Sequence, residues 1–396
     1  MFARFNEELR MASSNMKLTK STRGLFFTLL ALAFATGCNT LAKRSDTGVV
    51  VARRAQIRSS TAVVAADLLE VTRGDEVDIL DFQDVADPTD NSKKERWLRV
   101  QARDEDNTEG WIESRNIMPD AVLQSARKLA DEDKNIPAQA TGQLRASSNL
   151  RLNPDRGENE NIIMRLDSGS SFEIVGWKRV PKPKSSEVIE SDVAPKAGSA
   201  QQGTGRASKD NQGEENEPEE TNELWYKVRL PASISPAPAG WIYGKQVELA
   251  VPSDIIFYRT GREFVAWQRL DGESVETEAS AKSKDAARES KPGSWVILEK
   301  SSSNEPHTLV EPDFDRIYVL GYDKRDQEHY TAYRSPDLKG FLPCRVQGTA
   351  DNKNFTIRVQ DENGQINDVQ YGIYKDARGY VKVSAPNTPN KERKKR

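Results

Sequence analysis

Short runs in which apolar and polar residues alternate dominate the chain beyond residue 46, and turn-forming residues separate these runs. Residues 77–79 (VDI) and 172–174 (FEI) each place two apolar side chains on one face of a strand and an acidic side chain on the other. Gly74 and Gly169 stand just before these segments, where a turn needs a positive φ. The pattern predicts an all-β protein built from short, half-buried strands.

Four sequence blocks occur twice in the same order. They are 55–59 and 148–152, 71–79 and 166–174, 96–100 and 224–228, and 110–112 and 240–242. Each block is short and rich in β-branched or aromatic residues. The repeat predicts that one module of five or so strands occurs twice, and that each copy forms a small barrel.

The motif order of the repeat, which is Asn-Leu-Arg, apolar-x-x-Gly, Trp-x-x-Val and Gly-Trp-Ile, resembles that of the bacterial SH3-like domain family. The second copy carries these motifs at 149–151, 225–228 and 240–242, whereas the first has Gln56-Ile57 in place of Asn-Leu and Leu98 in place of the usual Tyr. The resemblance implies domains that contact peptidoglycan peptides or partner proteins, or that have a purely structural role.

These matches divide the chain into predicted domains. They are a signal peptide at 1–37, SH3-like domains at 46–119 and 141–250 with a helical linker at 120–140, a β-rich domain of unknown family at 251–386 and a disordered basic tail at 387–396. Within the second SH3-like domain, 181–222 is polar and has no aromatic residue, so we predict a disordered insertion that cannot offset its ordering entropy. A shorter polar loop at 81–95 is expected at the same place in the first copy.

The region after residue 251 has nine candidate strands. They are 255–258, 264–270, 295–298, 316–322, 330–333, 341–346, 355–359, 369–374 and 380–383. A polar loop is expected at 271–294, and 361–364 (DENG) is typical of a hairpin turn. The run of strands predicts an antiparallel meander that closes into a barrel or a sandwich.

The start of the chain has the pattern of a secretory signal. Lys17, Lys20 and Arg23 precede an apolar run at 24–34, which is too short to span a bilayer comfortably. The run ends in residues 35–38 (ATGC), which resemble the lipobox of bacterial lipoproteins. An uncleaved membrane anchor is the alternative interpretation of this segment.

The lipobox resemblance implies that Cys38 becomes the lipidated first residue of the mature protein, with chains such as palmitate holding it on a membrane. Ala35 stands where that family prefers Leu, and Met16 is the predicted start of translation. Asn39, rather than Asp, follows the cysteine, which favours the outer membrane with the protein facing the periplasm.

The charge of the chain argues against a nucleic-acid partner. Its formal net charge is −3, and only residues 391–396 (KERKKR) are strongly basic. Nucleic-acid-binding domains carry a clustered basic face instead.

Side chains suited to catalysis are scarce. Once Cys38 is lipidated, Cys344 has no cysteine partner, and its apolar segment predicts a buried thiol. His307 and His329 both precede Cys344, whereas papain-like cell-wall peptidases place the histidine after the nucleophile. The His-Glu-x-x-His spacing of zinc peptidases is absent. The sequence therefore predicts no enzyme activity, no metal and no cofactor.

The candidate ligand-binding residues are aromatic, because SH3-type barrels bind extended peptides along aromatic surfaces. They are Trp97, Trp111, Trp225, Tyr226, Trp241 and Tyr243. Strand alternation places Trp225 and Tyr226 on opposite faces, so one of the two is expected to be buried.

The favoured hypothesis is a membrane-anchored envelope lipoprotein without catalytic activity, which binds cell-wall peptide or an envelope protein through its barrels. Two alternatives stay open. One is an accessory subunit of an envelope complex that docks through 251–386, and the other is a cell-wall hydrolase.

Overall fold

The computed structural model describes residues 46–86, 94–157, 160–183, 221–259, 261–271, 292–301, 308–349 and 352–386. The signal segment, Cys38, most of the 181–222 insertion, most of the 271–294 loop and the basic tail lie outside the described residues. The chain divides into two compact units, Met1–Asp46 and Thr47–Arg396, and the described residues belong to the second, apart from Asp46. Within these ranges no helix has the length and apolar composition needed to cross a membrane.

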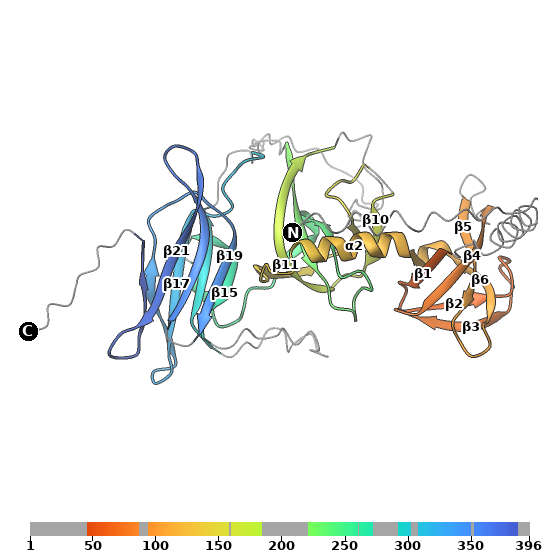
Figure 1. Ribbon diagram of the computed structural model, residues 1–396, viewed down its shortest axis with the longest axis horizontal. Coiled ribbons are helices and arrows are strands. Elements are labelled where there is room, and N and C mark those ends of the chain that lie inside the picture. Colours follow the sequence, from red (N-terminus) through yellow and green to blue (C-terminus); the bar gives the residue numbers. More distant parts are fainter. Residues whose placement is uncertain are drawn as a thin grey trace, which may run out of the picture. The chain divides into compact units, whose positions relative to one another are not determined.

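The protein is all-β, as the alternating pattern predicted: two curled antiparallel sheets of seven strands precede two antiparallel sheets of four (Figure 1). The first curled sheet, here called the first half-barrel, follows the strand order β3-β2-β6-β5-β4-β1-β7. Its strands are β1 (Asp46–Val50), β2 (Arg54–Arg58), β3 (Asp67–Thr72), β4 (Glu76–Ala86), β5 (Lys94–Ala102), β6 (Glu109–Glu113) and β7 (Ile117–Pro119).

The second curled sheet, here called the second half-barrel, has the equivalent order β10-β9-β13-β12-β11-β8-β14. Its strands are β8 (Ala140–Leu144), β9 (Ser148–Arg151), β10 (Ile162–Leu166), β11 (Ser171–Pro181), β12 (Asn222–Arg229), β13 (Ala239–Tyr243) and β14 (Val247–Leu249). A 3₁₀ turn precedes the last strand of each sheet, η1 (Ser114–Asn116) and η4 (Gly244–Gln246). The helix α2 (Asp120–Glu132) connects the two sheets, as the sequence predicted.

The strand register of the two half-barrels is also the same. Trp111 lies opposite Arg99 on β5 and Arg58 on β2, and Trp241 lies opposite Lys227 and Arg151 in the same way. Each register pair therefore identifies equivalent positions in the two half-barrels.

The glycine of each Gly-Trp-Ile motif lies where neighbouring atoms leave no room for a Cβ. A Cβ on Gly110 would come within 2.6 Å of the Arg58 carbonyl oxygen, and one on Gly240 within 2.6 Å of the Leu150 side chain. Gly74 and Gly169 adopt φ values of 97° and 80°, which confirms the predicted turns.

The C-terminal domain is a sandwich of two meanders, β15-β16-β17-β18 and β19-β20-β21-β22. The strands are β15 (Arg262–Arg269), β16 (Trp295–Ser301), β17 (Arg316–Asp323), β18 (Glu328–Arg334), β19 (Gly340–Thr349), β20 (Asn352–Gln360), β21 (Ile366–Lys375) and β22 (Val381–Ser384). Side chains from both sheets, such as Val296 and Val319 facing Phe355 and Ile357, form one buried cluster between them.

Two predicted boundaries are wrong. The expected strand at 255–258 is the 3₁₀ turn η5 (Ile256–Tyr258), because the amides of Ile255 and Ile256 both donate to the Pro252 carbonyl. The described parts of the expected loop at 81–95, which are 81–86 and 94–95, are strand, because Asp84 and Arg96 pair across β4 and β5; residues 87–93 lie outside the described residues.

The second half-barrel and the sandwich share a core. Phe172 and Ile242 of the half-barrel belong to the same buried cluster as Trp267 and Trp295 of the sandwich. Gln139, which is fully buried just before β8, donates to the Cys344 carbonyl at 3.0 Å and accepts from the Cys344 amide at 2.7 Å. A buried side chain that satisfies both backbone groups of another domain holds the two firmly together.

Candidate binding surfaces of the two half-barrels

Trp225 and Tyr243 lie in a closed aromatic cluster of the second half-barrel. Trp225 is only 1% exposed, and its ring centroid lies 5.6 Å from that of Tyr243. The Arg156 guanidinium covers the Tyr243 ring at 4.5 Å and forms a buried ion pair with Glu223. This packing leaves no open aromatic groove at the two residues, although the Trp225 Nε1 has no hydrogen-bond partner among the described residues.

Tyr226 faces the sandwich rather than solvent. It packs edge-on against Trp177 at 6.0 Å, and Trp177 donates from Nε1 to Asp313 Oδ1 at 2.5 Å. Arg179, two residues along β11, pairs with Glu311 at 3.7 Å. Burial raises the pKa of Tyr226 to about 12, and burial likewise raises the pKa of the Asp313 carboxyl. The sandwich therefore covers this end of the second half-barrel.

The surface around Trp241 lies next to the end of α2 and the linker that follows it. Lys227 Nζ lies 6.0 Å from the Trp241 ring and bonds to Glu132 at 2.7 Å and Asp133 at 2.5 Å. Arg229 donates to the carbonyls of Asp133 and Ile136. These bonds tie the helix and its exit to the second half-barrel beside Trp241.

The equivalent surface of the first half-barrel has no such cover among the described residues. Trp111 is half-buried, and Arg99 pairs with Glu109 of the same sheet instead of with a helix. Arg58 donates to the carbonyls of Val63 and Ala65 at 2.9 and 3.2 Å, which fixes the loop 59–66 beside the tryptophan.

Two apolar side chains project from that loop. Val63 is 72% exposed and Val64 is 93% exposed. We call the group formed by Arg58, Val63, Val64, Arg99 and Trp111 the Trp111 surface. Trp97, the remaining candidate of this half-barrel, is buried.

A further exposed apolar residue of the first half-barrel is Phe82, whose equivalent in the second half-barrel contacts the sandwich. Phe82 lies opposite Leu98 on β5, the position that Trp177 holds opposite Tyr226. Phe82 is 59% exposed, and the Arg96 guanidinium lies 4.7 Å above its ring. The residue that contacts the sandwich in one copy is therefore open to solvent in the other.

Sequence reasoning missed three parts of these surfaces. Val63 and Val64 lie between predicted strands, and Phe82 lies in the segment interpreted as a loop. The available signal was an apolar pair inside a run of small polar residues, which a search for strands passes over.

The groups considered for catalysis are in structural positions. Cys344 is fully buried, as predicted, and burial raises the pKa of its thiol to about 12. His329 contacts the Gly293 carbonyl at 2.8 Å and lies between Tyr258 and Tyr322. His307 lies outside the described residues, and among those described no three His, Cys, Asp or Glu side chains gather as a metal site would require.

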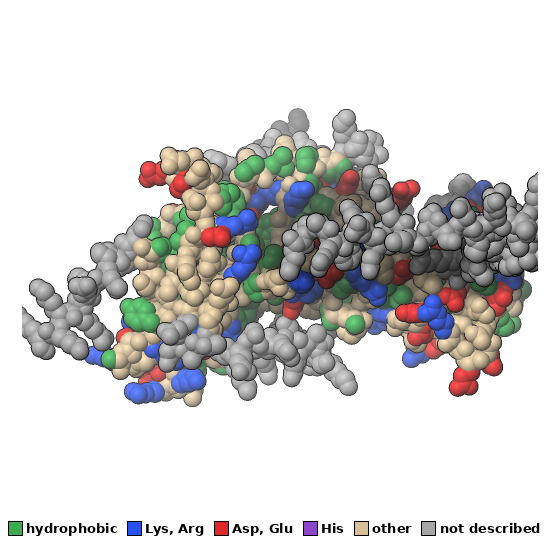
Figure 2. Space-filling view, viewed as in Figure 1, with side chains coloured by type: hydrophobic (Ala, Val, Ile, Leu, Met, Phe, Trp, Pro, Cys, Tyr) green, Lys and Arg blue, Asp and Glu red, His purple; other side chains and the backbone are tan. Residues whose placement is uncertain are grey.

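The charged side chains do not form a basic face on the side of the molecule shown in Figure 2, where basic and acidic groups are interspersed with apolar ones.

Comparisons with known proteins give little. No family model matches the chain, and no curated protein matches it. Among solved structures, one titled as NlpC2 from Trichomonas vaginalis aligns with 87% of this chain and 94% of its own, at 9% identity and a TM-score of 0.14. Similarity at this level does not show a shared fold.

Proposed function

We propose that this protein is a membrane-anchored binding protein of the cell envelope, without catalytic activity, whose first half-barrel holds an extended cell-wall peptide at the Trp111 surface. The observation that carries the proposal is the difference between two equivalent surfaces. The end of α2 bonds to Lys227 beside Trp241 and the sandwich packs against Trp177, whereas Arg99 beside Trp111 pairs within its own sheet and Phe82 is 59% exposed.

The chemistry of the Trp111 surface suits a peptide. Trp111 supplies a flat apolar contact, and Val63 and Val64 supply exposed apolar area on the loop that Arg58, the register partner of Trp111, holds. Arg58 and Arg99 border the ring along the register. Their partly exposed ion pairs with Asp67 and Glu109 contribute little to stability, so both arginines can exchange those partners for the carboxylates of a peptide. Extended peptides bind such shallow surfaces well because they lose little entropy on docking.

Co-sedimentation with purified peptidoglycan sacculi tests the proposal. The double variant Val63→Ser/Val64→Ser and the single variant Trp111→Ala should lose most of the sedimented fraction. The valine variant cannot empty the core, because both side chains are exposed. Phe257→Ser is the matched control, since Phe257 is 88% exposed but lies in η5, outside the strands of both half-barrels.

Wild-type protein that stays in the supernatant at low salt would contradict the proposal, and so would equal sedimentation of all four proteins. The anchor is tested separately. We expect mass spectrometry of the membrane fraction to find Cys38 acylated at the N-terminus, and Cys38→Ser to release the protein into the soluble fraction.

A further inference from the structure

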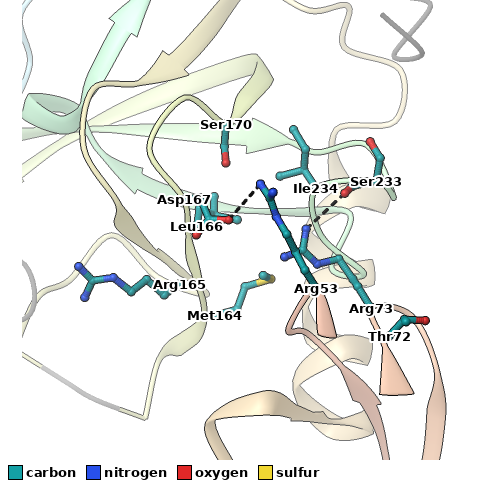
Figure 3. A pocket seen from close by; sticks show the side chains of 10 residues that line it. All are labelled: Arg53, Thr72, Arg73, Met164, Arg165, Leu166, Asp167, Ser170, Ser233 and Ile234. Atoms are coloured by element: carbon teal, nitrogen blue, oxygen red, sulfur yellow. Dashed lines mark hydrogen bonds and ion pairs between the residues drawn. The ribbon is translucent and has the colours of Figure 1, made fainter. Parts of the chain in front are cut away.

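A cavity of about 390 Å³ lies between the two half-barrels and takes no part in the surfaces described above (Figure 3). It is lined by Arg53, Thr72, Arg73, Met164, Arg165, Leu166, Asp167, Ser170, Ser233 and Ile234. The equivalent turns of the two repeats both contribute to it: Thr72 and Arg73 precede Gly74, and Asp167 and Ser170 flank Gly169. Its volume is in the range of small-molecule sites.

The cavity gathers positive charge in a chain that is acidic overall. Three arginines line it against one carboxylate, that of Asp167, while the whole chain carries a net −3. Burial and the nearby Arg53 charge lower the pKa of the Arg73 guanidinium. Two guanidinium groups close enough to destabilise each other's charge favour a bound anion between them.

Arg73 is held in place but has hydrogen-bonding capacity left. Its Nε donates to the Val51 carbonyl at 2.8 Å and its Nη1 to the Ser233 carbonyl at 3.3 Å. A guanidinium has five N–H donors, so these two bonds leave donors for a ligand. Figure 3 shows the Arg73 and Arg53 side chains close together in the cavity, with Arg165 pointing outward.

Arg53 can reorient toward a ligand at low cost. Its one ion pair is with Asp167 at 3.2 Å, and the two side chains are 77% and 60% exposed. Exposed pairs of this kind contribute little to stability. The Arg53–Asp167 pair therefore does little to hold the half-barrels together. An anion with several acceptor oxygens offers the guanidinium groups of Arg53 and Arg73 better partners.

We propose that the cavity formed by Arg53, Arg73 and the Ser170 and Ser233 hydroxyl groups binds the phosphoryl group of a phosphate monoester. Three guanidinium groups against the one carboxylate of Asp167 leave the lining a net charge of +2, from 3 − 1, for the ligand. A phosphate monoester carries about −1.5 to −2 at neutral pH, so its charge matches this net charge better than that of a single carboxylate does. The phosphoryl group belongs either to a soluble metabolite or to a lipid headgroup.

Calorimetric titration of the full chain with inorganic phosphate, in chloride buffer of low ionic strength, tests the site. Arg73→Ala and Arg53→Gln should each weaken phosphate binding about tenfold or more. Asp167→Asn should tighten binding because it removes a like charge, an effect that a purely structural joint would not show. Arg54→Ala is the matched control, since Arg54 adjoins Arg53 in sequence but pairs with Glu70 and does not line the cavity.

Vesicles distinguish the source of the phosphoryl group. Phosphatidylcholine vesicles with and without phosphatidic acid are compared for wild type and Arg53→Gln, so that any contribution of the anchor cancels. Binding that depends on both phosphatidic acid and Arg53 assigns a lipid headgroup, and binding to phosphate alone assigns a soluble ligand. No saturable binding in either arm, or equal weakening by Arg54→Ala, would overturn the proposal.

Discussion

The two half-barrels share strand order, register and turn glycines, yet their surfaces have different surroundings. In the second, the end of α2 lies beside Trp241 and the sandwich covers Trp177. In the first, Arg99 beside Trp111 pairs within its own sheet, and Phe82 is 59% exposed, although Trp111 is half-buried as Trp241 is. The two copies of the repeat thus share a fold but differ in what packs against them, and we propose that the first is the copy that binds.

Small differences at equivalent positions account for the contrast. Trp177 has an N–H group that satisfies a buried carboxylate of the sandwich, whereas Phe82 at the same position has no donor. Lys227 reaches two acidic residues at the end of α2, whereas Arg99 pairs within its own sheet. Surface residues rather than the shared core therefore decide which copy the chain covers.

The largest expected effect is on stability, and it tests whether Trp225 of the second half-barrel is a core residue. Trp225→Ala should lower the free energy of unfolding by about 3–5 kcal/mol, because it empties a buried site beside Tyr243. Urea denaturation measures the change. Lys178→Ala, which alters the exposed cross-strand neighbour of Trp225, is the control. A loss below about 1 kcal/mol would mean that Trp225 is not core and would weaken the contrast with Trp111.

The attachment of the second half-barrel to the sandwich depends on Gln139. Gln139→Ala leaves the Cys344 amide and carbonyl buried without these partners, which should cost about 2–4 kcal/mol. Hydrogen exchange read by mass spectrometry should show faster exchange in β8 and β19, with the first half-barrel unchanged. Gln143→Ala, on the more accessible part of β8, should change little. Faster exchange in β2 and β6 would contradict the separation of the two copies.

Substitutions of Gly110 and Gly240 test whether the two half-barrels are packed alike at equivalent positions. Gly110→Ala and Gly240→Ala should destabilise their half-barrels similarly, by about 1–3 kcal/mol, because the new Cβ meets packed atoms in each. Gly176→Ala has no atom within 4 Å of the new Cβ and should fold normally. Thermal unfolding monitored by circular dichroism checks all three. Markedly unequal losses for Gly110→Ala and Gly240→Ala would show that the two copies differ in their cores as well.

The smallest expected effect is a pH dependence of the free energy of unfolding that comes from Cys344 of the sandwich. Burial raises the pKa of the Cys344 thiol from 9.0 to about 12, so the folded thiol keeps its proton while the unfolded thiol loses it above pH 9. Between pH 9 and 10 the unfolding free energy should fall by up to about 1.4 kcal/mol. Cys344→Ala should reduce this slope in urea titrations and leave the smaller contribution of Tyr226 and Tyr371, whose pKa values burial also raises to about 12. A slope that is unchanged in Cys344→Ala would assign the effect to other groups.

Local pattern was enough to predict most elements but not their partners. Strict alternation located β20 around Phe355 and Ile357, and the repeat located Trp111 and Trp241 at equivalent positions. The run at 255–258 misled because four consecutive large apolar residues have no period, and the turn after Pro252 set their conformation.

The residues that pack on each surface could not be predicted, because they come from parts of the chain far away in the sequence. Trp177 meets Asp313, and Gln139 meets Cys344. Strand alternation could place Trp225 on one face of β12, but only the Arg156 and Glu223 pair shows that this face is closed. The exposure of Val63 and Val64 could not be predicted for the same reason. Whether an apolar side chain is exposed depends on whether a distant part of the chain packs on it.

The central claim is that the first half-barrel binds and the second supports. Hydrogen exchange of the full chain with and without peptidoglycan sacculi tests it most directly. We predict added protection in β2, in the loop 59–66 and in β6, with β9 and β13 unchanged. Protection in β9 and β13, or none in either half-barrel, would contradict the claim.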